Sequence, residues 1–122
     1  MLGVKEFSDL IYDKLAELED EVVLVNPSTE SKFPCREINT PLKRIDISNA
    51  LCTFQISIKH WNKRQRDSME MADSTDEKLL ELNLIRTNTS PCLYDEILQK
   101  YGLTTTYEVR YNAFTNAFEI IR

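Results

Sequence analysis

The stretch CTFQISIK, residues 52–59, alternates apolar and polar side chains without a break. A period of two places the apolar set on one face of a β-strand and the polar set on the other. The stretch therefore predicts a strand in a sheet that has one buried face and one polar face.

Two other segments carry the spacing of amphipathic helices. Across residues 4–18, apolar side chains recur at steps of three and four, as they do along one face of an α-helix. A second apolar stripe lies within residues 62–82, which fit either one long helix or two short ones. Its members are Met69, Ala72, Thr75, Leu79 and Leu82.

Shorter segments predict further strands. The run VVLV, residues 22–25, is β-branched and leads into a turn, and LIRT, residues 84–87, begins another strand. Residues 33–38 form a third candidate, which we place at a sheet edge because Pro34 has no N–H to donate to a neighbour. Residues 40–49 fit either an extended connection or the start of a strand, and both alternatives remain open.

The C-terminal part of the chain predicts a β-hairpin. Residues 105–112 and 117–122 are aromatic-rich and extended in pattern, with a turn near residues 114–116 between them. The segment YDEILQKYG before them fits a short helical turn that ends at Gly102.

These elements together predict an α+β fold, with an antiparallel β-sheet, helices packed on one face and a C-terminal β-hairpin. We expect residues 1–122 to form a single domain, because 122 residues lie within the usual size of one hydrophobic core.

The residue types that carry chemistry are sparse. With only two glycines in the chain, neither common phosphate-cradling loop can be built. The three cysteines lie far apart in the sequence, so we expect buried thiols and no disulfide framework. His60 is the only histidine, and at the end of a strand a structural role is favoured over that of a general base. The sequence therefore predicts no enzymatic activity, no metal site and no cofactor.

Charge and hydropathy restrict the partners. A net charge of -5 disfavours a protein that grips phosphates by general electrostatics. No apolar run approaches the roughly 20 residues that a membrane-spanning helix needs, and the N-terminal segment lacks the apolar centre of a secretory signal. We expect the protein to remain in the compartment where it is made.

A basic cluster follows the long strand. Lys63, Arg64 and Arg66 lie beside Trp61, a combination that can bind nucleic acid. Acidic residues follow at helical spacing, such as Glu70 four residues after Arg66, so an ordinary helix surface is favoured. Trp61 fits either the end of the core or a subunit interface, where tryptophan and arginine are enriched.

Four phrases stand out beside this order of elements: VVLVNPSTESKFPCREI, residues 22–38; FQISIKHW, residues 54–61, with NKRQR directly after it; and YEVRYNAFTNAFEIIR, residues 107–122. Together with the N-terminal helix, they resemble the bacteriophage tail terminator proteins, also called tail completion or tail-to-head joining proteins. The resemblance covers nearly the whole chain.

This resemblance implies a subunit of a ring, generally a hexamer, that caps the head-proximal end of the tail tube. Such a ring halts polymerisation of the tube and offers the surface on which the filled head docks. The implied partners are further copies of the chain, the tail tube protein and a head connector or neck protein, while DNA passes through without specific binding. The implied location is the tail–neck junction of the virion, after assembly in the host cytoplasm.

No catalytic residue is carried over from the family. The candidate contact residues fall into two groups, one at the junction of strand and basic helix and one around the hairpin turn. They are Trp61, Arg64 and Arg66, and Tyr111, Phe114 and Phe118. Tyr111 and Phe118 also fit an ordinary core, whereas an aromatic side chain in a turn, such as Phe114, has little core to enter.

Two alternatives remain beside the terminator hypothesis. Another head–tail joining or neck protein of the virion has a similar sequence pattern. A ferredoxin-like nucleic-acid-binding module would instead stack bases on aromatic side chains such as Phe54, Tyr107 and Tyr111, although the net charge of -5 counts against it. A hydrolase lacks the pair of nucleophile and base that it requires.

Overall fold

The computed structural model describes residues 2–18, 20–23, 27 and 31–121. These residues form an α+β fold with two helices on one face of a seven-stranded sheet and a hairpin at the C-terminus, as the sequence predicts. In chain order the elements are α1 (Val4–Leu15), β1 (Glu21–Val23), β2 (Cys35–Asp46), β3 (Leu51–Asn62), α2 (Gln65–Leu80), β4 (Ile85–Thr89), β5 (Leu93–Asp95), β6 (Lys100–Asn112) and β7 (Ala117–Glu119).

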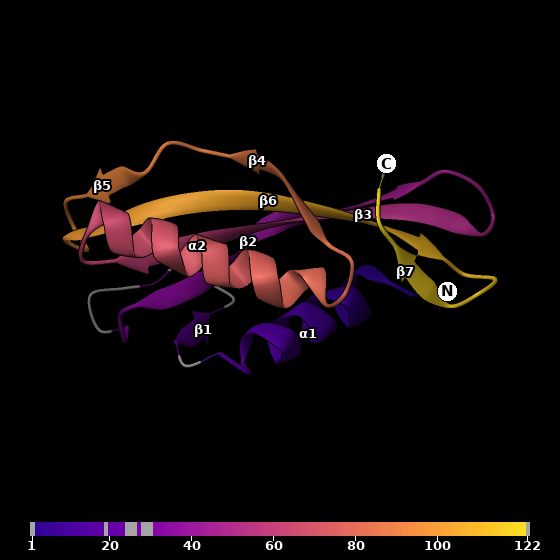
Figure 1. Ribbon diagram of the computed structural model, residues 1–122, viewed down its shortest axis with the longest axis horizontal. Coiled ribbons are helices and arrows are strands. Elements are labelled where there is room, and N and C mark those ends of the chain that lie inside the picture. Colours follow the sequence, from indigo (N-terminus) through magenta and orange to yellow (C-terminus); the bar gives the residue numbers. More distant parts are fainter. Residues whose placement is uncertain (1, 19, 24–26, 28–30, 122) are drawn as a thin grey trace.

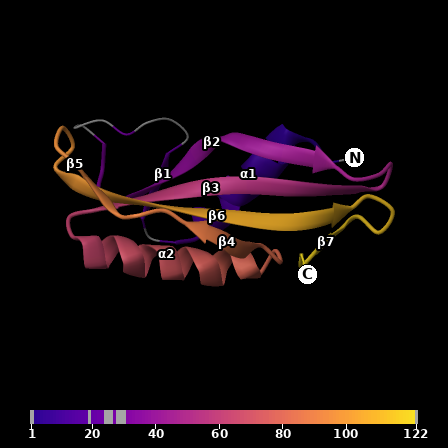
Figure 2. The same cartoon turned by 90° about the horizontal axis from the view of Figure 1, so that it is seen from above.

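The sheet is built around two long central strands, β3 and β6, which pair antiparallel from end to end (Figures 1 and 2). The strand order is β1-β2-β3-β6-β4, and every pair is antiparallel except β1 with β2. β4, β5 and β7 divide the far edge of β6 among them. β1 covers only the first three residues of β2, so no described strand pairs with the outer edge of β2 beyond Glu37.

Both helices cover the same face of the sheet, where the apolar residues of β3 and β6 gather (Figure 1). The period of two sends Phe54, Ile56 and Ile58 of β3 into this core, and all three are fully buried. Phe7 of α1 stacks on Phe54 with ring centroids 4.3 Å apart. Among the described residues neither helix has the length and apolar character needed to cross a membrane.

On the opposite face the described residues form no helix, and the side chains there are polar. Its side chains pair across the strands: Gln55 Nε2 donates to Glu108 Oε1 at 3.1 Å, and the hydroxyls of Ser57 and Thr106 lie 2.9 Å apart. We call this surface the outer face. It is where the polar half of the CTFQISIK alternation lies.

The prediction of an edge strand at residues 33–38 is wrong in two respects. The strand is β2, which begins one residue later than Pro34 and continues through most of the stretch left open as residues 40–49. Its first residues pair with β1 on one side and β3 on the other. Pro34 precedes the hydrogen-bonded ladder, so its missing N–H costs the sheet nothing.

The second predicted helix is confirmed as one helix, but its buried stripe differs in part. Met69 is exposed, whereas Ser68 and Met71 are buried together with Ala72, Thr75 and Leu79. The buried stripe includes a serine because Ser68 Oγ donates to the backbone oxygen of Tyr101 at 3.1 Å. The first helix ends at Leu15, three residues before the predicted limit.

The segment YDEILQKYG is not a helical turn. It forms β5, a turn and the start of β6, with Gly102 inside the strand. The turn closes with Gln99 at φ 55°, and the paired residues Tyr94 and Tyr101 pack edge to face at 5.1 Å. Aromatic pairing across strands therefore overrides the local helical pattern. Of the run VVLV, the last two residues lie outside the described residues.

Candidate partner-binding site

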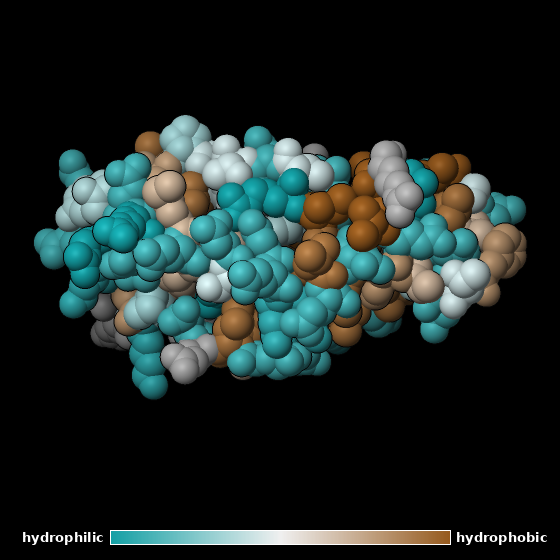
Figure 3. Space-filling view, in the orientation of Figure 1, coloured by the Kyte–Doolittle hydropathy of each residue, from teal (hydrophilic) through white to brown (hydrophobic). Residues whose placement is uncertain are grey.

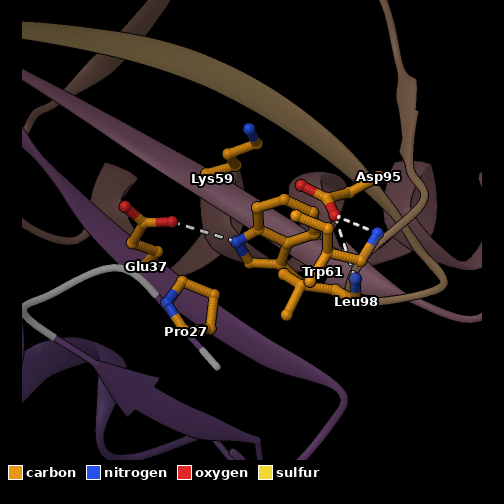
Figure 4. A pocket seen from close by; sticks show the side chains of 7 residues that line it. Pro27, Glu37, Lys59, Trp61, Asp95 and Leu98 are labelled. Atoms are coloured by element: carbon orange, nitrogen blue, oxygen red, sulfur yellow. Dashed lines mark hydrogen bonds between the residues drawn. The ribbon is translucent and has the colours of Figure 1, made fainter. Parts of the chain in front are cut away.

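Trp61 marks a pocket on the outer face, near the end of β3 (Figure 4). The pocket has a volume of about 330 Å³ and is lined by Pro27, Glu37, Lys59, Trp61, Asp95, Ile97 and Leu98. We call it the Trp61 pocket. It is assembled from β2, β3 and the turn between β5 and β6, so that elements far apart in the sequence contribute to one cavity.

The indole of Trp61 is held in place from two sides. Its Nε1–H donates to Glu37 Oε1 at 3.0 Å, a contact drawn in Figure 4. Gly102 lies opposite Trp61 on β6, and a Cβ atom there would come within 3.0 Å of the ring and 2.5 Å of Lys59 Cε. The absence of a side chain at Gly102 therefore lets both side chains lie flat on β6.

The polar groups around the Trp61 pocket already have partners within the chain. Lys59 Nζ lies 4.3 Å from the centroid of the Trp61 ring, within the range of a cation–π interaction. One carboxylate oxygen of Asp95 accepts from the backbone N–H groups of Ile97 and Leu98, both at 2.9 Å. The apolar part of the lining, Pro27, Trp61, Ile97 and Leu98, offers a surface for an apolar side chain beside these internal contacts.

The structure separates the candidate residues of the first group. Trp61 is only 4% exposed and lines the pocket, whereas Arg64 and Arg66 are exposed at the start of α2 and do not line it. Arg64 pairs with Asp67 at 3.2 Å and Arg66 with Glu70 at 3.5 Å. Both arginines thus have the helix-surface contacts that their spacing predicts.

The hairpin residues are also divided. Tyr111 is buried, and Phe118 packs against it with ring centroids 5.4 Å apart. Phe114 is 87% exposed at the tip of the β6–β7 turn. Asn112 Oδ1 accepts from the backbone N–H groups of Phe114 and Thr115, so Phe114 projects from a turn that is fixed by hydrogen bonds.

Phe114 belongs to a larger apolar surface. The turn between β2 and β3 lies beside it, because Ala113 N donates to Ala50 O at 2.7 Å. Ile45, near the end of β2, and Ile47, at the start of that turn, are both half exposed. We call these three residues the hairpin end. In Figure 3, hydrophobic side chains gather over the half of the molecule that carries β7 and the C-terminus.

A second apolar group lies at the other end of the sheet, around β5 (Figure 2). Leu93, Tyr94 and Ile97 are exposed there, Ile97 at 81%, and Ile97 also lines the Trp61 pocket. We call this group, with the pocket, the pocket end. Sequence pattern does not predict the pocket end, because residues 94–102 resemble a helical turn and become β5, a turn and β6 only through pairing. It does not predict the exposure of Ile45 and Ile47 either, because residues 40–49 fit a connection as well as a strand.

His60 is enclosed in a buried hydrogen-bond chain beneath α2. Its Nδ1 lies 3.0 Å from the Leu103 carbonyl oxygen, and its Nε2 lies 2.8 Å from Thr75 Oγ1. Since a carbonyl only accepts, Nδ1 carries the proton and Nε2 accepts from Thr75. Arg36 Nε donates to the same hydroxyl at 2.8 Å. Both ring nitrogens are therefore committed to structural partners.

Burial and two arginines hold this imidazole neutral. Burial, with Arg36 and Arg86 nearby, lowers the pKa of His60 to about 3. Burial also lowers the pKa of the Arg36 guanidinium. The ion pair of Arg36 with Asp20, at 2.9 Å, opposes this lowering. Such an arrangement stabilises the layer between helix and sheet and leaves no accessible base.

A second cavity, of about 260 Å³, lies between α2 and the β4–β5 edge, and Arg86, Cys92 and Leu103 are among its lining residues. Arg86 is paired with Asp76 at 2.7 Å, and burial together with Asp76 raises the pKa of the neighbouring Tyr107. Among the residues that the structure describes, no three acidic, histidine or cysteine side chains cluster as a metal site would require. No protein-family model and no curated protein matches this chain.

Proposed function

We propose that this chain is a structural protein of a bacteriophage tail. In this proposal it forms a ring, generally a hexamer, at the head-proximal end of the tail tube, stops polymerisation of the tube and provides the docking surface for the head. The chain has no catalytic role in it. The observation that carries the proposal is the presence of apolar side chains at both ends of one long sheet.

Within one molecule, the hairpin end and the pocket end lie too far apart for their apolar side chains to shield each other from water. Asn112 at the hairpin end lies ten positions along β6 from Gly102, which is opposite Trp61, and ten steps correspond to about 33 Å along a strand. A symmetric dimer that joined two hairpin ends would leave both pocket ends exposed. Head-to-tail association covers both ends of every subunit, and this is the kind of interface that closes into rings.

The distribution of charge agrees with a ring through which DNA passes. The two helices carry four basic and eight acidic residues and so account for four of the chain's five net negative charges. A helical layer of this kind repels a phosphate backbone instead of holding it.

The nucleic-acid-binding alternative loses its stacking surface. Phe54, Tyr107 and Tyr111, the aromatic side chains that such a module would use, are buried beneath the helices. Bases stack on aromatic side chains only where the rings are exposed. The outer face, which no helix of the described residues covers, presents hydroxyl and amide groups in their place.

The proposal is tested by mixing the purified protein with growing tail tubes and imaging the tube ends by electron microscopy. We expect rings at one end of each tube and tubes that stop growing. Bare ends with unaltered growth would remove the terminator role and favour a neck component that binds the head instead.

A matched pair of variants tests the part played by the hairpin end. Phe114→Asp places a charge on an exposed apolar side chain, while Thr115→Asp places the same charge on the neighbouring exposed residue. Both variants are expected to fold. Capping of tubes is expected to be lost in Phe114→Asp and retained in Thr115→Asp. Equal capping by both would remove Phe114 from the interface.

A further inference from the structure

We propose that Phe114 of one copy of this chain inserts into the Trp61 pocket of the next copy. The contact deepens the ring proposal and rests on its requirement that copies associate head to tail. It assigns an occupant to the pocket and a receptor to the exposed aromatic side chain.

The fit of size and chemistry supports this pairing. An apolar cavity of about 150 Å³ is large enough for a benzene ring, and the Trp61 pocket measures about 330 Å³. Its apolar lining consists of Pro27, Trp61, Ile97 and Leu98. One carboxylate oxygen of Glu37 and one of Asp95 already accept hydrogen bonds within the chain, and Lys59 already lies over the Trp61 ring, so an incoming phenyl ring need not break any of these contacts.

The shape of the donor supports it as well. Aromatic anchors that fill a partner's pocket dominate many interfaces, particularly where they are held rigidly before binding. Phe114 is 87% exposed, and Asn112 fixes the backbone of its turn. Little conformational entropy is therefore lost when the ring enters a pocket.

Charge complementarity identifies a second copy as the occupant. Arg110 lies on the outer face four residues before Phe114, and its Nε is buried with no hydrogen-bond partner among the described residues. Glu96 stands in the chain between Asp95 and Ile97, which line the pocket; it is exposed and forms no ion pair within the described part of the chain. Docking of Phe114 therefore brings Arg110 of one copy toward Glu96 of the next copy. Neither side chain has an ion pair within the described part of its own chain.

The only tryptophan of the chain lies in the pocket, so its fluorescence reports occupancy directly. The acceptor is Phe114→Ala, which keeps Trp61 and lacks the inserting ring. The donor is Trp61→Phe, which keeps Phe114 and is silent when tryptophan is excited selectively. Circular dichroism of each variant confirms that it is folded before mixing.

Titration of the acceptor with the donor is expected to give a saturable change in Trp61 emission. The control donor, Trp61→Phe with Phe114→Ala, is expected to bind at least about thirtyfold more weakly, the effect of removing an interface anchor. Identical curves for the two donors, or no change up to about 1 mM donor, would overturn the proposal.

A charge exchange gives an independent readout. Arg110→Glu in the donor is expected to weaken the titration about fivefold, as for a partly exposed ion pair, and Glu96→Arg in the acceptor is expected to restore it. Failure of the second change to restore binding would show that these residues do not face each other.

Both experiments use the protein without tail tubes. A saturable titration together with bare tube ends would preserve the contact between copies and remove the terminator role. Capped tubes together with no change in Trp61 emission would support the terminator role and overturn the contact between Phe114 and the Trp61 pocket.

Discussion

His60 occupies a position that only a neutral imidazole satisfies, and this has a consequence for stability. Its folded-state pKa of about 3 lies below the ordinary value of 6.5. As the pH falls below 6.5, the unfolded chain takes up a proton that the folded protein excludes, so stability is complete above that pH and is lost below it. Between pH 6.5 and pH 5 the loss is expected to be about 2 kcal/mol.

Urea denaturation at a series of pH values measures this slope. His60 is the only histidine, and few other side chains titrate between pH 5 and 6.5. The variant His60→Asn is expected to be less stable at neutral pH but to show a flat profile in this range. A wild-type profile that is equally flat would contradict a buried neutral imidazole.

A glycine is needed at position 102 because neighbouring side chains fill the space that a Cβ atom would take, and not because of its backbone conformation. In Gly102→Ala the new Cβ would lie 3.0 Å from the Trp61 ring and 2.5 Å from Lys59 Cε. Lys59 can move away, but Trp61 is buried, so the variant is expected to lose about 1–3 kcal/mol of stability. The emission spectrum of Trp61 is expected to shift as well.

Thr104→Ala is the matched control, because Thr104 lies two residues further along the same face of β6. It is expected to leave the spectrum of Trp61 unchanged. A Gly102→Ala spectrum that matches the wild type would show that the indole does not rest on this strand.

Part of the candidate site could be predicted from the types and positions of single residues. Phe114 was predicted to be exposed from its place in a turn, and the structure places it there. The pocket around Trp61 could not be predicted, because Glu37 lies 24 residues away and Gly102 lies on another strand. The contact of Arg36 with Thr75 spans 39 residues, a separation that no local pattern encodes.

At the scale of elements, the two helices are joined by alternating charges. Lys14 Nζ contacts Glu81 at 2.9 Å, and Lys78 Nζ contacts Glu17 at 3.0 Å. These contacts raise the pKa of Lys78, chiefly through its hydrogen bond with Glu17, and lower that of Glu81, chiefly through its hydrogen bond with Lys14. The four side chains form a network in which each charge faces two of the opposite sign.

Glu81→Lys is expected to destabilise the protein by placing a third cation in this network. The urea midpoint should fall at low salt, and the difference from wild type should shrink in high salt, since exposed charges are screened. Glu77→Lys makes the same charge change on the exposed surface of α2, where no ion pair of Glu77 occurs within the described part of the chain. Equal effects of the two variants would attribute the loss to net charge alone.

Prediction of elements succeeded where one pattern continued without interruption. β3 alternates over residues 52–59 and β6 over residues 105–112, and both segments are strands as expected, whereas the first residues of β6 were not predicted. The short strands were harder, since three residues of β5 gain their structure from pairing with β6 and not from their own sequence. The parallel pairing of β1 with β2 also depends on a contact that local pattern does not contain.

At the scale of the whole molecule, the acidic helical layer predicts weak binding to DNA. The protein is expected to bind duplex DNA with a dissociation constant weaker than about 0.1 mM at physiological salt. Anisotropy of a labelled duplex, measured over a range of salt concentrations, tests this. Tight binding that falls steeply with salt would contradict the ring proposal and favour a nucleic-acid-binding protein.

The two edges of the sheet differ, and the difference limits how the chain can aggregate. On one side β4, β5 and β7 present only three to five residues each, lengths that offer a poor template for another chain. On the other side, the described part of β2 beyond Glu37 has no neighbouring strand. A fibre grows only if each added sheet exposes a new usable edge. Misassembly through backbone pairing is therefore expected to stop at two molecules, joined β2 to β2, and not to continue into fibrils.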